Sequence, residues 1–206
     1  MTISYPLSLP TTPYPARVTV RARSVVGVSE SPFSYSQQVQ RHTGERWEAD
    51  VQLPPMRQAV AETWVAWLLS LGGRYGTFNM GDPAHLTYRG AGGGTPLVNG
   101  ASQTGGTLAV DGCPTTTTGW LLPGDVIQLG SGSTARLHKV LTRADTNGSG
   151  EVTLDIWPRL RSSPANNAAV TITGCLGLWR LASNEAGWDI GAAKVYGISF
   201  AAIESL

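Results

Sequence analysis

The stretch RWEADVQLPPMRQAVAETWVAWLLSLGG, residues 46–73, joins a strand pattern directly to a helix pattern. Residues 46–53 alternate between polar and apolar side chains, which predicts a strand with one face in a core and the other in solvent. The apolar residues of this strand are Trp47, Ala49, Val51 and Leu53. The remainder predicts a helix over residues 55–71 that covers a sheet, since prolines precede it, glycines follow it and its apolar side chains recur at helical spacing. These apolar side chains are Val60, Trp64, Trp67, Leu68 and Leu71.

Two carboxylates, Glu48 and Asp50, share the polar face of the strand, about 7 Å apart by the rise of an extended chain. Paired carboxylates on one face are the chemistry of glycoside hydrolases. The alternation requires polar residues at these positions in any case, and Arg46 offers a nearby charge partner. We therefore interpret the pair as part of a solvent-facing surface.

The composition favours a β-rich protein without a strong electrostatic field. Of the 206 residues, 14% are charged, against about 25% in typical soluble proteins, and the formal net charge is +1. This balance offers no attraction to nucleic acid or to an anionic membrane surface. The 25 glycines and 13 prolines are typical of many short strands joined by turns.

The apolar runs of the chain are too short to cross a membrane. None approaches the ~20 residues that a helical span requires, so we expect no membrane contact. Residues 1–15 are interrupted by prolines and lack the basic start of a signal peptide. We therefore expect a protein that is made and used in a cytoplasm, or assembled into a larger structure there.

The second half of the chain predicts a separate small β domain. After GTFNMGDP, residues 76–83, the segment 89–106 contains few hydrophobic side chains and is interpreted as a linker or long loop. Short apolar runs bounded by glycine and proline then predict a small barrel or sandwich. The runs are residues 107–112, 126–130, 135–141, 151–157 and 168–174.

The C-terminal segments predict a return to the first domain. Residues 176–183 and 193–206 have strand patterns, and four apolar side chains alternate on one face of the second. These four are Tyr196, Ile198, Phe200 and Ala202. We therefore predict a mainly β protein, with a first domain of residues 1–85 together with 176–206 and an inserted domain of residues 86–175. Such an insertion requires its two ends to lie close together.

A search for catalytic and metal-binding patterns yields no site. The histidines His42, His85 and His138 have no ligand spacing, no serine lies in a GxSxG turn, and GTFNMGDP matches no phosphate-binding loop. Residues 145–151, DTNGSGE, match the first half of a calcium loop, but Ile156 stands where an acidic ligand is required, which favours a hairpin turn. We therefore predict no enzymatic activity, no catalytic residue, no cofactor and no metal.

The two cysteines, Cys113 and Cys175, lie far apart in the sequence and form no zinc-binding pattern. A disulfide between them is disfavoured in a cytoplasmic compartment, although the sequence leaves the pairing open. We interpret both as small apolar residues on strands.

The inserted domain offers two tryptophans but no basic groove. Between residues 90 and 175, five basic residues are balanced by five acidic residues. A groove for single-stranded nucleic acid requires positive charge and several stacking rings, and this segment has only Trp120 and Trp157. Because one or two tryptophans can hold a sugar, Trp120 and Trp157 are candidate carbohydrate contacts.

Residues 31–83, from SPFSYSQ to GTFNMGDP, resemble the N-terminal part of distal tail proteins and closely related minor tail or hub proteins of long-tailed bacteriophages, the siphophages. The matching features are the SPF loop, Trp47 before an alternating strand, the LPPM entry to a Trp/Leu helix and the GTF…GDP exit. The later segments GDVIQLG, ARLHKVL and EVTLDIWPRLR are similar to the second domain of such proteins.

This resemblance implies a structural virion component without catalytic residues. Distal tail proteins form a homohexameric ring in the baseplate that connects the tail tube protein to the hub or tip protein. The resemblance implies a tail-tube-like β-sandwich with a packed helix, and an inserted OB-like or galectin-like barrel. We therefore expect assembly in the bacterial cytoplasm and a final location at the virion tail tip. The alternative is a carbohydrate-binding or receptor-binding module at that tip, with Trp120 and Trp157 as contacts.

Overall fold

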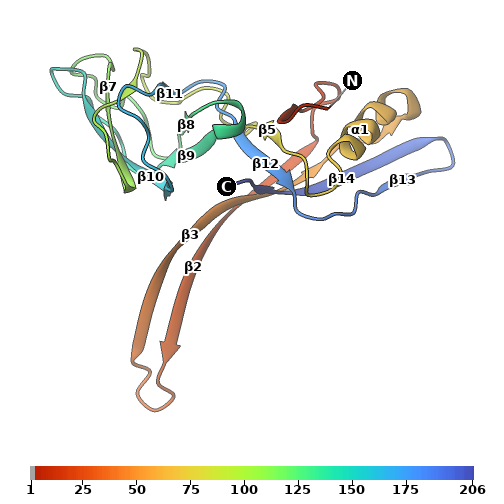
Figure 1. The fold of residues 1–206 in the computed structure, drawn as a ribbon, viewed down its shortest axis with the longest axis horizontal. Helices are drawn as coiled ribbons and strands as arrows, with labels where there is room; N and C mark the ends of the chain where they lie inside the picture. Colours follow the sequence, from red (N-terminus) through yellow and green to blue (C-terminus); the bar gives the residue numbers. More distant parts are fainter. Residues whose placement is uncertain (1–2) are drawn as a thin grey trace.

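The computed structural model describes residues 3–206 and is mainly β, with two sheet-based units side by side and a long hairpin that projects away from both (Figure 1). One unit is built on a larger sheet of eight strands, and the other on a six-stranded sheet that is nearly closed into a barrel. Within the described residues, the larger sheet carries the one α-helix. The prediction of a mainly β fold with one helix and a small barrel is confirmed.

The larger sheet is organised around its last strand, β14. The second half of β14 pairs with β12 and β3, and its first half pairs with β13 and β4. The sheet order is β1 (Leu7–Ser8), β5 (Phe78–Met80), β12 (Gly177–Leu181), β14 (Val195–Glu204), β3 (Gln37–Gln52), β2 (Arg17–Glu30), with β4 (Met56–Arg57) and β13 (Trp188–Ile190) beside β14. The alternation predicted for the last strand is confirmed, because Tyr196, Ile198 and Ala202 are buried and Phe200 is half-buried against the same core.

Helix α1 (Gln58–Ser70) packs on this sheet, but it starts three residues later than the predicted 55–71. Met56 and Arg57 instead form β4 and pair with the start of β14, so the two prolines precede a short strand. The buried stripe is Ala61, Trp64, Val65 and Leu68, at helical i, i+3, i+4 and i+7 spacing. Val60 lies one position off this stripe and is exposed, so its assignment to the core is wrong.

Aromatic side chains fill the space between α1 and the larger sheet. The Trp67 ring meets Phe78 edge-on at 5.0 Å between centroids and lies 5.6 Å from Phe200. The indole nitrogen of Trp67 donates to the carbonyl of Ser8 at 2.8 Å, which satisfies its polar atom. This contact ties the short first strand to the helix.

The second unit is a nearly closed barrel. The order of its strands is β11 (Val170–Thr171), β8 (Val126–Leu129), β9 (Arg136–Val140), β10 (Val152–Leu160), β7 (Gly105–Asp111), β6 (Leu97–Val98), and η1 (Gly132–Thr134) joins β8 to β9. A bridge between Leu97 and Ala169 connects the two ends of this order. The segment 89–106 is therefore not a linker, since it contributes β6 and the start of β7, and its Val98 is fully buried.

The chain passes between the two units at adjacent points. All strands from residue 97 to 171 belong to the barrel unit, and the strands before residue 81 and after residue 176 belong to the larger sheet. A side chain at Gly81 would overlap the carbonyl oxygen of Cys175. The outgoing and returning segments are therefore in direct backbone contact, and a glycine makes that approach possible.

Candidate assembly interface

The most distinctive surface of the molecule is the outer half of the β2–β3 hairpin, residues 25–44, which we call the arm. It extends beyond both units as a two-stranded ribbon (Figure 1). Every residue of the arm is exposed, apart from the half-buried Ser31. A two-stranded ribbon with water on both faces has little stability of its own, so this shape is favoured when a partner covers it.

One face of the arm, which we call the apolar face for its three valines, also carries Arg41 opposite Val26 and the pair Glu30 and Gln37. Val28 lies directly opposite Val39, and cross-strand partners point to the same face of a sheet. Val26 is two residues from Val28 and shares that face, whereas the neighbouring pair Ser29 and Gln38 occupies the opposite one. The three valines are between 48% and 60% exposed. The arm therefore presents a valine stripe with no cover within the described chain.

The tip of the arm adds two aromatic rings to this surface. Phe33 is 95% exposed and Tyr35 is 74% exposed, so neither ring packs on its own chain. Several large apolar side chains exposed on one projecting segment are typical of an interaction surface. Aromatic residues at a projecting tip are typical of anchors that enter a partner's pocket.

The root of the arm is held by a buried carboxylate. Glu45 is 4% exposed and accepts hydrogen bonds from the Arg159 backbone N–H at 2.9 Å and from the Arg41 guanidinium at 2.7 Å. Burial alone would raise the pKa of Glu45, but these donors outweigh it and hold the pKa below its ordinary value. Because Arg159 belongs to β10, this carboxylate links the arm to the barrel unit.

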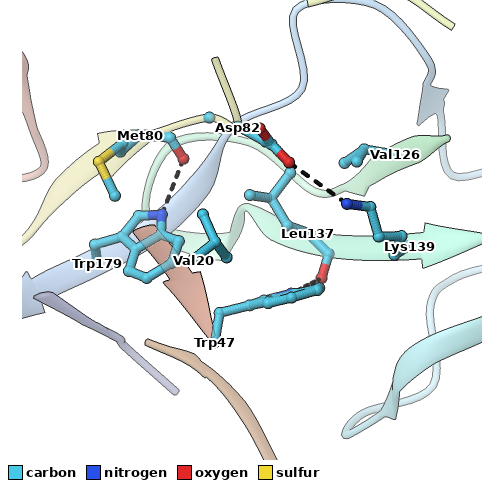
Figure 2. Close-up of a pocket in the computed structure, with 9 residues that line it drawn as sticks. Val20, Trp47, Met80, Asp82, Val126, Leu137, Lys139 and Trp179 are labelled. Atoms are coloured by element: carbon cyan, nitrogen blue, oxygen red, sulfur yellow. Dashed lines mark hydrogen bonds and ion pairs between the residues drawn. The ribbon is translucent and has the colours of Figure 1, made fainter. Parts of the chain in front are cut away.

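The two units meet along a seam beside the arm root. In Figure 2, the indole nitrogen of Trp47 donates to the carbonyl of Leu137 at 3.0 Å, and Lys139 pairs with Asp82 at 3.5 Å. Trp47 also meets Trp157 edge-on, with 4.4 Å between ring centroids. The cavity at the seam measures about 20 Å³, enough for about one water molecule, so it is a packing seam and not a ligand site.

The structure separates the two candidate sugar contacts. Trp120 has no exposed surface, lies in the barrel core and donates from its indole nitrogen to the carbonyl of Gly93 at 3.1 Å. The prediction that it contacts carbohydrate is wrong, because neither ring face can reach a ligand. Trp157 is half-buried against Trp47 at the seam. The two tryptophans therefore do not form one exposed platform.

The paired carboxylates of β3 are both engaged by arginines. Glu48 accepts from Arg46 at 2.7 Å, and Asp50 accepts from Arg21 at 2.5 Å. The local charge partner predicted for Glu48 is confirmed. Neither carboxylate faces a cavity with a second unpaired acid, so the pair lacks the arrangement of a hydrolase site.

The predicted turn at residues 145–151 is confirmed, and it lies between the antiparallel strands β9 and β10. The Asn147 side-chain oxygen accepts from the backbone N–H groups of Ser149 and Glu151, both at 2.9 Å, and Asp145 accepts from the Gly119 backbone at 2.6 Å. These oxygens are therefore occupied by the fold. Across residues 3–206, no group of three or more His, Cys, Asp or Glu side chains is close enough to hold a metal ion.

The two cysteines are free thiols in different cores. Cys113 lies in the barrel core and Cys175 in the core of the larger sheet. Burial raises the pKa of Cys113 to about 12 and that of Cys175 to about 11. Both thiols are therefore protonated at neutral pH and poor nucleophiles, in agreement with their interpretation as small buried residues. Their placement on strands is wrong, because Cys113 follows β7, which ends at Asp111, and Cys175 lies between β11 and β12.

Sequence reasoning missed the arm and the ion pairs at its root. The sequence predicted a strand over residues 46–53, whereas β3 runs unbroken from Gln37 to Gln52. The SPF loop at residues 31–33 is present, since β2 ends at Glu30 and β3 begins at Gln37. The alternation of Val26 and Val28 is the sequence feature that could have indicated a strand extending into the arm. The contacts of Glu45 with Arg159 join residues more than 100 positions apart, so no local spacing marks them.

No protein-family model and no curated protein matches the chain. Within residues 3–206, no helix is long and apolar enough to cross a membrane.

Proposed function

We propose that this chain is a structural subunit of a siphophage tail, a distal tail protein whose copies form a ring between the tail tube and the hub or tip. The resemblance of residues 31–83 supports the family. The observation that carries the proposal is the arm, whose valine stripe and aromatic tip lie in water. Covering apolar side chains stabilises an assembly by roughly 25 cal/mol per Å² removed from water.

A second copy of this chain is the partner we assign to the arm. When an arm on one subunit packs on a different surface of the next, the contact repeats around an axis and can close into a ring. The larger sheet also has an open edge beside the arm root, because β2 is the last strand of its order. An open strand edge is a ready surface for a neighbouring chain.

The remaining parts of the proposal follow the resemblance. The larger-sheet unit takes the place of the tube-like ring domain, and the barrel unit lies on its outside. Tube and hub proteins are the neighbours above and below the ring, at the virion tail tip. The alternative of a carbohydrate-binding module would need contacts other than Trp120, which is enclosed in the barrel core.

The oligomeric state of two matched variants tests the role of the arm. Val28→Lys with Val39→Glu places a charge pair on the apolar face, and Ser29→Lys with Gln38→Glu places the same pair on the polar face. We expect the unmodified chain and the polar-face variant to associate in sedimentation or native mass spectrometry, with six copies in a closed ring. The apolar-face variant should remain monomeric. A monomeric unmodified chain, or equal behaviour of the two variants, would contradict the proposal.

A further inference from the structure

The barrel unit has an opening between β9 and β10. These strands pair only at Ile156–Val140 and Trp157–Lys139, and Pro158, which follows, has no N–H to continue the ladder. After Pro158, β10 pairs with β7 on its other side, where Leu160 lies opposite Gly105. A pocket of about 220 Å³ occupies the resulting gap between the ends of the two strands.

Positive charge is in excess around this pocket. Arg136 and Arg161 line it, and Arg161 donates to Glu204 at 2.7 and 2.8 Å. Arg136 is half-buried and donates to the backbone carbonyl of Ala135 at 2.9 Å, and among residues 3–206 it has no carboxylate within ion-pair distance. Burial lowers the pKa of Arg136 more than the nearby Glu204 raises it. A half-buried guanidinium without an anion is costly, and a bound anion would remove that cost.

His138 adds a hydrogen-bond acceptor to the same pocket. It is 2% exposed, and its Nδ1 lies 2.6 Å from the carbonyl oxygen of Pro158. Because a carbonyl can only accept, Nδ1 carries the proton, and Nε2 of the neutral ring is left with a free lone pair. A guanidinium donor beside an imidazole acceptor suits a ligand that carries both an anionic group and a hydroxyl.

We infer that this pocket binds a small hydroxylated anion, with its carboxylate or phosphate paired to Arg136 and a hydroxyl donating to Nε2 of His138. Pockets for drug-sized ligands measure about 300–1,000 Å³, so this smaller one fits a single acidic sugar ring or a glycerol-sized phosphate. The inference is independent of the ring proposal, since it uses only the barrel unit and its contact with Glu204.

Titration of the full chain with three small molecules tests the inference. Glucuronate supplies a carboxylate on a sugar ring, glucose supplies a comparable ring without the charge, and glycerol phosphate supplies a phosphate beside hydroxyls. We expect glucuronate or glycerol phosphate to bind at least tenfold more tightly than glucose in calorimetry. Preference for one of the two anions identifies the source as an acidic sugar or a phosphate. Binding of neither anion, or equal binding of glucose, would overturn the inference.

A pair of arginine variants locates the site. Arg136→Gln should weaken anion binding at least tenfold, whereas Arg143→Gln, an exposed arginine of the same unit paired with Asp145, should not change it. If Arg136→Gln does not fold, amide NMR of the unmodified chain replaces it. Anion-induced shifts should then centre on residues 136–138 and 160–165. Unchanged binding in folded Arg136→Gln, or shifts centred elsewhere, would contradict the assignment.

Discussion

Arg161, the residue after β10, and Glu204 of β14 join the barrel unit to the larger sheet through a two-point contact, with nitrogen–oxygen distances of 2.8 and 2.7 Å. Glu204 also accepts from the backbone N–H of Trp47 at 3.0 Å, and its side chain is 3% exposed. Arg161 donates in addition to the backbone carbonyl of Glu45 at 2.6 Å. The last strand, the arm root and the barrel therefore meet at one ion pair, whose carboxylate is buried and whose guanidinium is 21% exposed.

Removal of the charge on Glu204 should destabilise the whole chain. Glu204→Gln keeps the shape of the side chain but leaves the partly exposed Arg161 without its anion. We expect a loss somewhat below the roughly 3–5 kcal/mol that removal of one partner of a fully buried pair costs. The free energy of unfolding in urea measures this loss. Asp50→Asn serves as a control, because its pair with Arg21 is about half-exposed and screened by water, so its loss should change the stability little. Similar losses in both variants would contradict a special role for the junction.

His138 should make the protein less stable in mild acid. Burial lowers the pKa of His138 from 6.5 to about 4, with the charges of Arg161 and Arg136 acting in the same direction. The folded state therefore favours the neutral ring, and the associated stability is complete above pH 6.5 and lost as the pH falls from 6.5 towards 4. At about 1.4 kcal/mol per pKa unit, the full loss is roughly 3 kcal/mol.

Unfolding measurements between pH 7.5 and pH 4.5 check this dependence. His138→Gln removes the titrating ring and should flatten the pH profile in this window. His42→Gln, in the exposed arm, should retain the profile of the unmodified chain. An unchanged slope in His138→Gln would rule out this histidine as the source.

The crossing between the two units should not tolerate a side chain at Gly81. A Cβ there would overlap the carbonyl oxygen of Cys175, so Gly81→Ala should force the crossing segments apart and cost about 1–3 kcal/mol. Gly187→Ala provides a control, because an added Cβ at Gly187 meets no atom within 4 Å. Thermal unfolding should show a lower melting temperature for Gly81→Ala alone. Equal melting temperatures would show that the crossing is looser than the structure describes.

The arm should be dispensable for folding and required for association. Ser24 and Glu45 are direct cross-strand partners, so replacing residues 25–44 with Asn-Gly closes the hairpin through a two-residue turn. The deletion removes Arg41, but Glu45 keeps its hydrogen bond from the Arg159 backbone N–H, and the removed residues are exposed apart from the half-buried Ser31. We therefore expect a folded chain with a melting temperature within a few degrees of the original, and monomers in sedimentation. A shortened chain that still associates would exclude the arm as the contact, and an unfolded one would show that the arm stabilises the units.

Local patterns in the sequence predicted the elements whose burial follows from their own periodicity. Alternation placed Ala49 and Val51 in the core, and helical spacing placed Trp64 and Leu68 there. The helix was predicted to start three residues too early, because Met56 and Arg57 pair as β4 with β14, a strand far away in the sequence.

Features made by distant segments could not be predicted in this way. Trp120 has the same sequence signature whether its ring is enclosed in a core or laid on a surface, and only the barrel around it decides between them. The pocket at Arg136 exists because β9 and β10 separate after Trp157. The residue pattern within either strand does not indicate that separation.

Gold-labelled antibody against this chain, imaged on virus particles from the source culture, tests the central claim most directly. We predict gold at the junction between the tail tube and the tip, as expected for a ring subunit at that position. Particles of the same culture treated with an unrelated antibody provide the control. Absence of label from the particles would contradict the assignment to a tail, and label confined to peripheral fibres would contradict the ring.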